Sequence, residues 1–242
     1  MAWVTKSSDE QYAPEPASRE YTKQEKAANW WHYHKITVLV VVLAAAMAAW
    51  LVHDMFFRVQ PDVQIGYVGT TVLPAETVQA LEQALTPYAS DSNGDGQVIV
   101  QLDQYAVDFA NENADPAGQL AGTTQLTAAL AESSGTYLFL LEDPAGFESQ
   151  IQALQFTDGT LPGEADTGRW QQMVYRWQDC PVLAGLDLGT VSSGESSVSG
   201  QELLAGVYLG CRGSWAEEVP DAYTRNAALW AALTAGASPV EE

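Results

Sequence analysis

The sequence predicts an α/β protein, with an N-terminal transmembrane helix followed by one three-layer α/β domain whose sheet is mostly parallel. Three observations support this fold class. Residues 36–52 contain no charged residue, three strand-like segments then alternate with three helix-like segments, and those strands are apolar along almost their whole length. Strands that are apolar on both faces are typical of parallel sheets covered by helices on each side.

The first 57 residues are expected to form a tail and a long helix. Residues 1–21 are polar, contain Pro14 and Pro16, and are predicted to be a disordered cytoplasmic tail. Thr22 is followed three residues later by Glu25, the pattern of a capping box, so a helix is expected to begin there. Residues 22–57 are therefore predicted to be one juxtamembrane and transmembrane helix.

The segment 36–52, ITVLVVVLAAAMAAWLV, is the predicted membrane span. Its 17 residues cover about 25 Å at about 1.5 Å per residue, near the short end of what a bilayer core requires. Aromatic residues, which favour the headgroup level, flank the run on both sides: Trp30, Trp31, Tyr33, Trp50, Phe56 and Phe57. We expect the lipid bilayer to be a partner of this chain through residues 36–52.

The basic residues predict the orientation. Five of them precede the span, at Lys6, Arg19, Lys23, Lys26 and Lys35, whereas Arg58 is the one base in the next hundred or so residues. By the positive-inside rule, the N-terminus is cytoplasmic and the C-terminal domain extracellular. A cleaved secretory signal is the alternative, with an A-x-A site among Ala44, Ala46 and Ala48. The long segment before the run favours a retained signal-anchor.

Residues 60–237 are predicted to be one extracytoplasmic α/β domain. Strands are expected at 63–69, 98–102 and 136–141. Helices are expected to follow each strand, beginning at Pro74, at the pair 115–116 and at the pair 143–144, where proline marks a first turn. Their predicted buried faces are Val78, Leu81 and Leu85; Leu120, Thr123, Leu126 and Leu130; and Phe147, Ile151 and Leu154.

The second half of the domain is less regular. Its apolar runs predict strands at 169–177, 181–189 and 202–210, and a final helix at 224–235. The Ser/Gly-rich stretch 190–200 is predicted to be a mobile loop. Residues 238–242 are expected to be a frayed tail.

The charge of the outer region excludes several functions. Residues 60–242 contain 25 acidic residues and four arginines, with no lysine and no histidine. They therefore cannot form a Ser-His-Asp unit, a histidine-bearing zinc site, a lysine Schiff base or a Walker-type phosphate loop. A surface this acidic also repels phosphate backbones, so nucleic acid is not an expected partner.

Cys180 and Cys211 are the two cysteines of the chain. An extracellular location would be oxidising, so the sequence predicts a disulfide between them. A pair of buried thiols is the alternative. Redox catalysis is disfavoured, because no C-x-x-C pattern and no neighbouring base is present to lower a thiol pKa.

A possible metal loop lies at 91–98, with the sequence DSNGDGQV. Acidic and amide side chains at every second position, with glycine at the sixth, suit Ca²⁺, which requires several oxygen ligands at once. The segment resembles the first part of an EF-hand or dockerin calcium loop. This resemblance implies Asp91, Asn93 and Asp95 as side-chain ligands and Gln97 as a backbone ligand, and Ca²⁺ as the bound ion.

The loop departs from that family at its twelfth position, where Leu102 replaces an acidic residue. A bound ion would therefore require a remote carboxylate or waters. The alternative is an ordinary Asn-Gly and Asp-Gly turn that joins a helix to a strand.

A ligand cleft is expected at the carboxyl ends of the strands, where open α/β sheets bind their ligands. The candidates there are Thr70, Thr71, Glu142 and Asp187. Trp170, Trp177 and Trp215 could stack on sugars, although tryptophan is more often a core or interface residue.

The layout of a basic, aromatic-rich segment, one span and an acidic α/β domain resembles uncharacterised single-pass membrane proteins of Gram-positive bacteria. Three functions are compatible with it. The first is a non-catalytic, membrane-anchored extracytoplasmic binding or interaction module for an unknown extracellular protein or small ligand, with Ca²⁺ as a candidate stabilising ion. The others are a carboxylate-based or metal-assisted hydrolase, and a single-span sensor.

Overall fold

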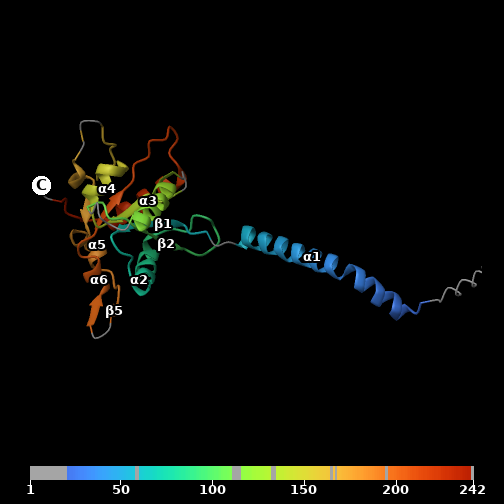
Figure 1. Cartoon of the computed structure of the whole chain (residues 1–242). Helices are drawn as coiled ribbons and strands as arrows, with labels where there is room; N and C mark the ends of the chain where they lie inside the picture. The colour runs from blue at the N-terminus through green and yellow to red at the C-terminus, as the bar shows by residue number, and fades with distance from the viewer. Residues whose placement is uncertain are drawn as a thin grey trace, which may run out of the picture. The chain divides into compact units, whose positions relative to one another are not determined.

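The computed structural model describes residues 21–57, 60–110, 116–131, 135–163, 166, 168–193 and 196–240. Its internal contacts divide the chain into two units, residues 1–59 and residues 60–242 (Figure 1). The predicted disordered tail lies outside the described residues except for Tyr21, and residues 241–242 also lie outside them.

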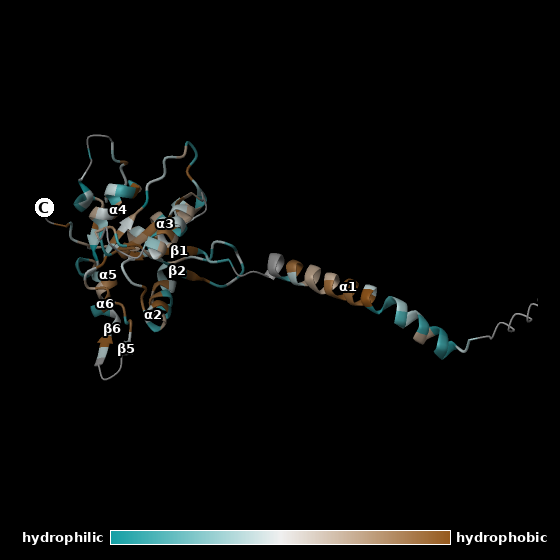
Figure 2. Cartoon of the chain, in the orientation of Figure 1, coloured by the Kyte–Doolittle hydropathy of each residue, from teal (hydrophilic) through white to brown (hydrophobic). Residues whose placement is uncertain are grey.

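The described part of the first unit is dominated by one helix, α1 (Lys23–Phe57). Its N-terminus has the predicted capping box: the amide of Glu25 donates to Oγ1 of Thr22 at 3.3 Å, and the Thr22 amide donates to Oε2 of Glu25 at 2.9 Å. Figure 2 shows the hydrophobic residues of α1 gathered in its C-terminal half. The helix is long and apolar enough to cross a membrane.

The second unit contains a five-stranded sheet with the order β2-β1-β3-β7-β4. The strands are β1 (Val63–Gly69), β2 (Val100–Ala106), β3 (Leu138–Leu141), β4 (Val174–Arg176) and β7 (Tyr208–Cys211). β1 pairs in parallel with β2 and β3, whereas β7 pairs antiparallel with β3 and β4. The sheet is therefore mixed, and the predicted mostly parallel arrangement is limited to β2, β1 and β3.

Helices cover both faces of this sheet. The main ones are α2 (Ala75–Leu85), α3 (Pro116–Ala131), α4 (Pro144–Ile151) and α7 (Asp221–Leu233). Successive residues of β3 point to opposite faces: Leu138 and Leu140 pack in one apolar cluster with α2 and α7, and Phe139 and Leu141 pack in the other with α3 and α4. This alternation explains why the strand is apolar throughout.

The first half of the domain follows the sequence pattern closely. β1 has its predicted bounds, whereas β2 is longer than predicted and β3 shorter. Asp143 caps α4 by accepting the amide of Gly146 at 2.9 Å. The buried face of α3 was predicted only in part: Leu126 is buried as predicted, whereas Leu120 and Thr123 are exposed and Gly122 faces the core.

The second half differs more from the prediction. Residues 181–189, predicted as a strand, begin as the helix α5 (Pro181–Ala184), because Pro181 suits a first helical position. The predicted mobile loop 190–200 contains a hairpin of β5 (Thr190–Ser193) and β6 (Ser196–Ser199).

The predicted strand 202–210 overlaps the helix α6 (Gly200–Leu203), which begins with a capping box between Ser199 and Glu202, and becomes a strand only at Tyr208. The predicted strand 169–177 is reduced to β4, which lies between short 3₁₀ helices at Trp170–Gln172 and Trp177–Asp179. Another 3₁₀ helix, Thr86–Tyr88, follows α2. Near the C-terminus, the amide of Ser238 donates to the carbonyl of Asp179 at 3.1 Å.

Candidate functional site

Two of the predicted cleft residues, Thr70 and Glu142, meet where β1 and β3 end. Both the amide and the hydroxyl of Thr70 donate to Oε2 of Glu142, at 2.8 and 3.0 Å. The phenol of Tyr67 donates to Oε1 at 2.5 Å. Burial, and then the bond to Glu142, raise the pKa of Tyr67 well above its usual value. The Glu142 carboxylate thus already occupies the amide of Thr70, just after β1, to which an anionic ligand would otherwise bind.

A cavity of about 300 Å³ adjoins these side chains, lined by Val68, Gly69, Thr70, Val107, Asp108, Phe109, Ala110, Glu142 and Asp143. Its carboxylates are engaged within the protein. Asp143 caps α4, Oδ1 of Asp108 accepts the amide of Ala110 at 3.1 Å, and Glu142 is bonded to Tyr67 and Thr70. We interpret this cluster as a set of structural hydrogen bonds that holds the ends of the strands together and leaves no free carboxylate for a ligand.

The other two predicted cleft residues lie differently. Thr71 is exposed and follows Thr70 in the loop after β1. Asp187 lines a separate depression with Ala80, Gln83, Ala84, Pro87, Tyr88, Gly185 and Leu186, and accepts the amide of Gly189 at 3.1 Å. The predicted four-residue cleft is therefore not assembled, because the segment after Pro181 adds no strand beside β3.

The proposed calcium ligands form a turn that bonds to itself. The two carboxylate oxygens of Asp91 accept the amides of Gly94 and Gly96, at 2.7 and 2.9 Å. Oδ1 of Asn93 accepts the amide of Asp95, and Oδ1 of Asp95 accepts the amide of Gln97, both at 2.8 Å. Gly94 and Gly96 adopt positive φ, which favours glycine.

Asp62, which is buried, anchors this turn from outside. Its carboxylate accepts the amides of Ser92, Asn93 and Ile99 at 2.6, 3.3 and 2.9 Å. Burial acts to raise the pKa of Asp62, but these hydrogen bonds outweigh it and lower the pKa. Across the described ranges, no group of three or more His, Cys, Asp or Glu side chains could hold a metal. The geometry favours the turn, and the calcium site stays a prediction.

Cys180 and Cys211 are both buried and both free in the structure, so the predicted disulfide is not formed there. They belong to the apolar cluster that packs with α2 and α7. Burial, and then the charge of Asp179, raise the pKa of Cys180 to about 11. Burial raises the pKa of Cys211 to about 12. Both thiols are thus protonated at neutral pH and unsuited to nucleophilic chemistry.

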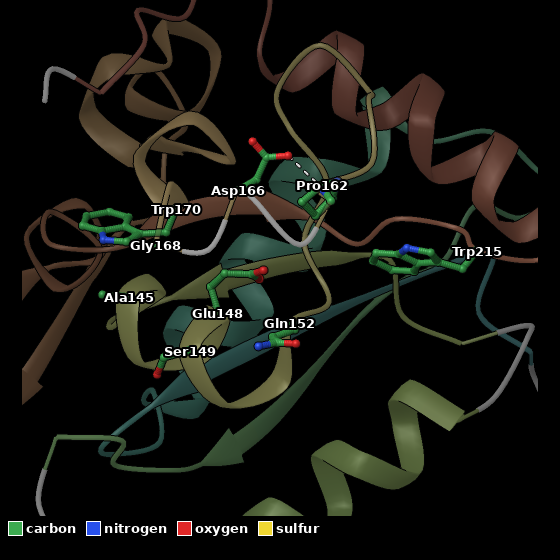
Figure 3. A pocket seen from close by; sticks show the side chains of 10 residues that line it. Ala145, Glu148, Ser149, Gln152, Pro162, Asp166, Gly168, Trp170 and Trp215 are labelled. Carbon is green, nitrogen blue, oxygen red and sulfur yellow. Dashed lines mark hydrogen bonds between the residues drawn. The ribbon is translucent and has the colours of Figure 1, made fainter.

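A different pocket, of about 330 Å³, lies between α4 and the segment that follows it (Figure 3). This volume is at the lower end of the usual range for small-ligand sites. The lining residues are Ala145, Glu148, Ser149, Gln152, Pro162, Gly163, Asp166, Gly168, Trp170 and Trp215. We call this space the α4 pocket.

The wall formed by α4 carries a buried carboxylate. Glu148 is 8% exposed, and its Oε2 accepts the amide of Leu154 at 3.2 Å. Burial raises the pKa of Glu148, and the amides of Leu154 and Ala153 offset this in part. In the part of the chain that the structure describes, Glu148 has no ion-pair partner. Its negative charge is therefore met at the pocket wall only by backbone amides and not by a cation of the described residues.

The end of α4 places a second polar group beside Glu148. Gln152 caps the helix with φ of 53°, in the left-handed region that residues with a side chain rarely adopt. This turn redirects the chain so that the amide of Gly213 reaches the carbonyl of Ala153 at 3.0 Å. The strained residue lines the pocket, as is common for residues at binding sites.

Two tryptophans flank the pocket on opposite sides of Glu148 in the view of Figure 3. Trp170 packs edge-on against Tyr208, with ring centroids 5.8 Å apart. Trp215 is 53% exposed and lies over Gly213, where an added Cβ would be 2.9 Å from the indole. An exposed indole held against the backbone is a preformed surface for a ligand.

Asp166 closes the pocket opposite α4 and is held by local bonds. Its carboxylate accepts the amide of Gly163 at 2.9 Å and pairs with Arg169 at 2.6 Å. These contacts, the bond from Gly163 first, lower the pKa of Asp166. The pocket thus holds two carboxylates whose pKa values are shifted in opposite directions.

Sequence reasoning singled out Trp170 and Trp215 but missed Glu148. The available signal was its position on α4, directly after the buried Phe147. Trp177 is fully buried in the apolar cluster that packs with α2 and α7, and it cannot reach a ligand.

Comparisons of the chain with family models, with curated proteins and with solved structures find no match. The functional argument therefore depends on the geometry of the α4 pocket.

Proposed function

We propose that this chain is a membrane-anchored binding module, in which α1 is the anchor and the domain 60–242 takes a small ligand in the α4 pocket. One observation carries this proposal. Two tryptophans and a buried carboxylate that has no counter-ion among the described residues line a single cavity. Ligand pockets typically combine aromatic walls with a few polar groups that fix the orientation of the ligand.

A panel of small molecules tests the proposal on the full chain, held in a neutral polyether detergent. The panel covers neutral saccharides, amino acids and amines, and the readout is tryptophan fluorescence together with thermal unfolding. A ligand that binds only the folded state raises the unfolding midpoint. We expect at least one class to bind, and Trp215→Ala to weaken that binding.

Val219→Ala is the matched control. Val219 is 55% exposed, close to the exposed fraction of Trp215, but it does not line the pocket. Equal weakening by both substitutions would contradict the proposal, and so would a panel in which no class binds.

A hydrolase is the second candidate, favoured by one observation: Glu148 has a raised pKa and Asp166 a lowered one within the same pocket. Glycosidases use two carboxylates with separated pKa values, one as the acid and one as the base or nucleophile. Against this, the Asp166 carboxylate already pairs with Arg169. Turnover of aryl glycosides that is lost in Glu148→Gln would establish the hydrolase instead of the binding module.

A further inference from the structure

The class of ligand follows from the charge of Glu148. A buried carboxylate is costly unless a cation or several hydrogen bonds compensate for it. Glu148 has hydrogen bonds from backbone amides but no cation among the described residues. A neutral sugar would bury this charge further without a counter-ion, whereas a cationic ligand would supply one.

Arg169 cannot take this role, although it adjoins Trp170. Its guanidinium pairs with Asp166 at 2.6 Å, donates to Oε1 of Gln172 at 2.6 Å, and lies over the ring of Phe156 at 5.3 Å from the centroid. With these contacts Arg169 lines a separate depression beside Phe156 and Gln172, and it is not among the residues that line the α4 pocket. The charge of Glu148 is therefore left to a ligand.

A metal ion fits the pocket poorly. Calcium takes about six to eight oxygen ligands, and no group of three or more His, Cys, Asp or Glu side chains that could hold a metal is found among the residues described. The lining of the pocket does include two indole rings, those of Trp170 and Trp215. Tryptophan rings attract organic cations, and aromatic groups with a carboxylate are a common way to bind a substituted ammonium.

The charge of the whole domain favours the same sign of ligand. Residues 60–242 carry 25 acidic residues against four arginines. Such a field raises the local concentration of cations and repels anions.

We infer that the α4 pocket binds a small organic ammonium cation, with Glu148 as its counter-ion and Trp170 and Trp215 as aromatic walls. This inference rests on the proposed function, because it names the ligand class of the same pocket. According to this inference, phosphates, carboxylates and neutral sugars are not ligands of the pocket.

The test uses choline and its neutral carbon isostere, dimethylbutanol, which have the same shape and differ in charge. Both are titrated into the full chain in neutral polyether detergent, which contributes no cation and no sugar. We expect choline to bind and the isostere to bind at least about tenfold more weakly. Loss of one ring in Trp215→Ala should weaken choline binding by roughly tenfold.

Glu148→Gln keeps an acceptor for the amide of Leu154 and removes the charge, so choline binding should be lost. Asp187→Asn is the matched control, because it removes one charge of the same domain outside the pocket. Equal binding of choline and its isostere, or unchanged binding in Glu148→Gln, would overturn the inference.

The two proposals fail in distinguishable ways. Binding of a neutral saccharide that depends on Trp215, with no binding of choline, would refute the ammonium ligand and leave the binding module standing. Absence of binding by every class would refute both. Trp215 is exposed, so the result for Trp215→Ala does not depend on a change in folding.

Discussion

At the scale of single residues, Glu148 is expected to lower the stability of the fold while serving ligand binding. A carboxylate whose pKa is raised on folding favours the protonated form of the folded protein, so its contribution to stability is complete below the ordinary pKa of glutamate. That contribution is lost as the pH rises through the raised pKa. Glu148 therefore destabilises the unliganded fold at neutral pH, as a residue kept for binding would.

We predict that Glu148→Gln stabilises the unliganded protein at neutral pH, by about 1 kcal/mol, because it removes a buried charge that no cation of the described residues neutralises. The difference should shrink as the pH falls below the ordinary pKa of glutamate, near 4.3, since the wild-type carboxyl is then neutral. Urea unfolding at two pH values measures this. A variant that is less stable at neutral pH would show that the Glu148 charge is compensated in the fold.

Gly69 is the second residue on which the structure depends. An added Cβ would lie 2.6 Å from Cδ of Glu142 and 2.7 Å from the Tyr67 phenol oxygen. These atoms belong to the bonded cluster at the strand ends, so they have little freedom to move.

We predict that Gly69→Ala lowers the free energy of unfolding by about 1–3 kcal/mol, the usual cost of overpacking. Gly206→Ala is the control, since nothing lies within 4 Å of its added Cβ. Chemical denaturation of both variants measures the difference. Equal stabilities would mean that Glu142 moves freely and that the strand ends are not closed by its bonds.

At the scale of elements, the loop 91–97 illustrates how one pattern serves two structures. Oxygen-bearing residues at every second position can point at an ion or accept the amides of their own turn. In this chain the amides of Gly94, Gly96 and Gln97 take the oxygens of Asp91 and Asp95. Asp62 completes the turn from the start of the domain.

We predict that thermal unfolding has the same midpoint in calcium and in chelator, because these oxygens are already bonded within the turn. The measurement is made on the full chain and on Asp95→Ala. A midpoint that rises in calcium for the wild type, and not for Asp95→Ala, would establish the calcium loop that the sequence predicts.

At the scale of the whole molecule, the two units differ in polarity and charge. The first is an exposed apolar helix that is long enough to cross a membrane. The second carries the whole excess of negative charge. The arrangement that the sequence predicts, a single-pass protein with its basic side in the cytoplasm, would account for both.

We predict that protease added outside right-side-out vesicles degrades the domain 60–242 and leaves an N-terminal tag intact. Inverted vesicles should give the reverse pattern, since the positive-inside rule predicts that the basic residues before the span face the cytoplasm. Release of the domain without added protease would point to a cleaved signal, and a protected domain would refute the orientation.

The sequence by itself determined the features that depend on neighbours along the chain. The capping box of Thr22 and Glu25 and the cap at Asp143 form within a few residues. The strand β1 and the helix α1 are recognised from their own apolar runs. Local hydrogen bonds and hydropathy are sufficient to specify them.

The tertiary structure alone decided what depends on distant contacts. Because β7 enters between β3 and β4 and runs against both, the sheet is mixed, which no local pattern in the apolar run 202–210 indicates. Likewise, Glu148, Trp170 and Trp215 are far apart in the sequence and share one pocket only after folding. The burial that raises the pKa of Glu148 is a property of that packing, because desolvation depends on which segments surround a charge.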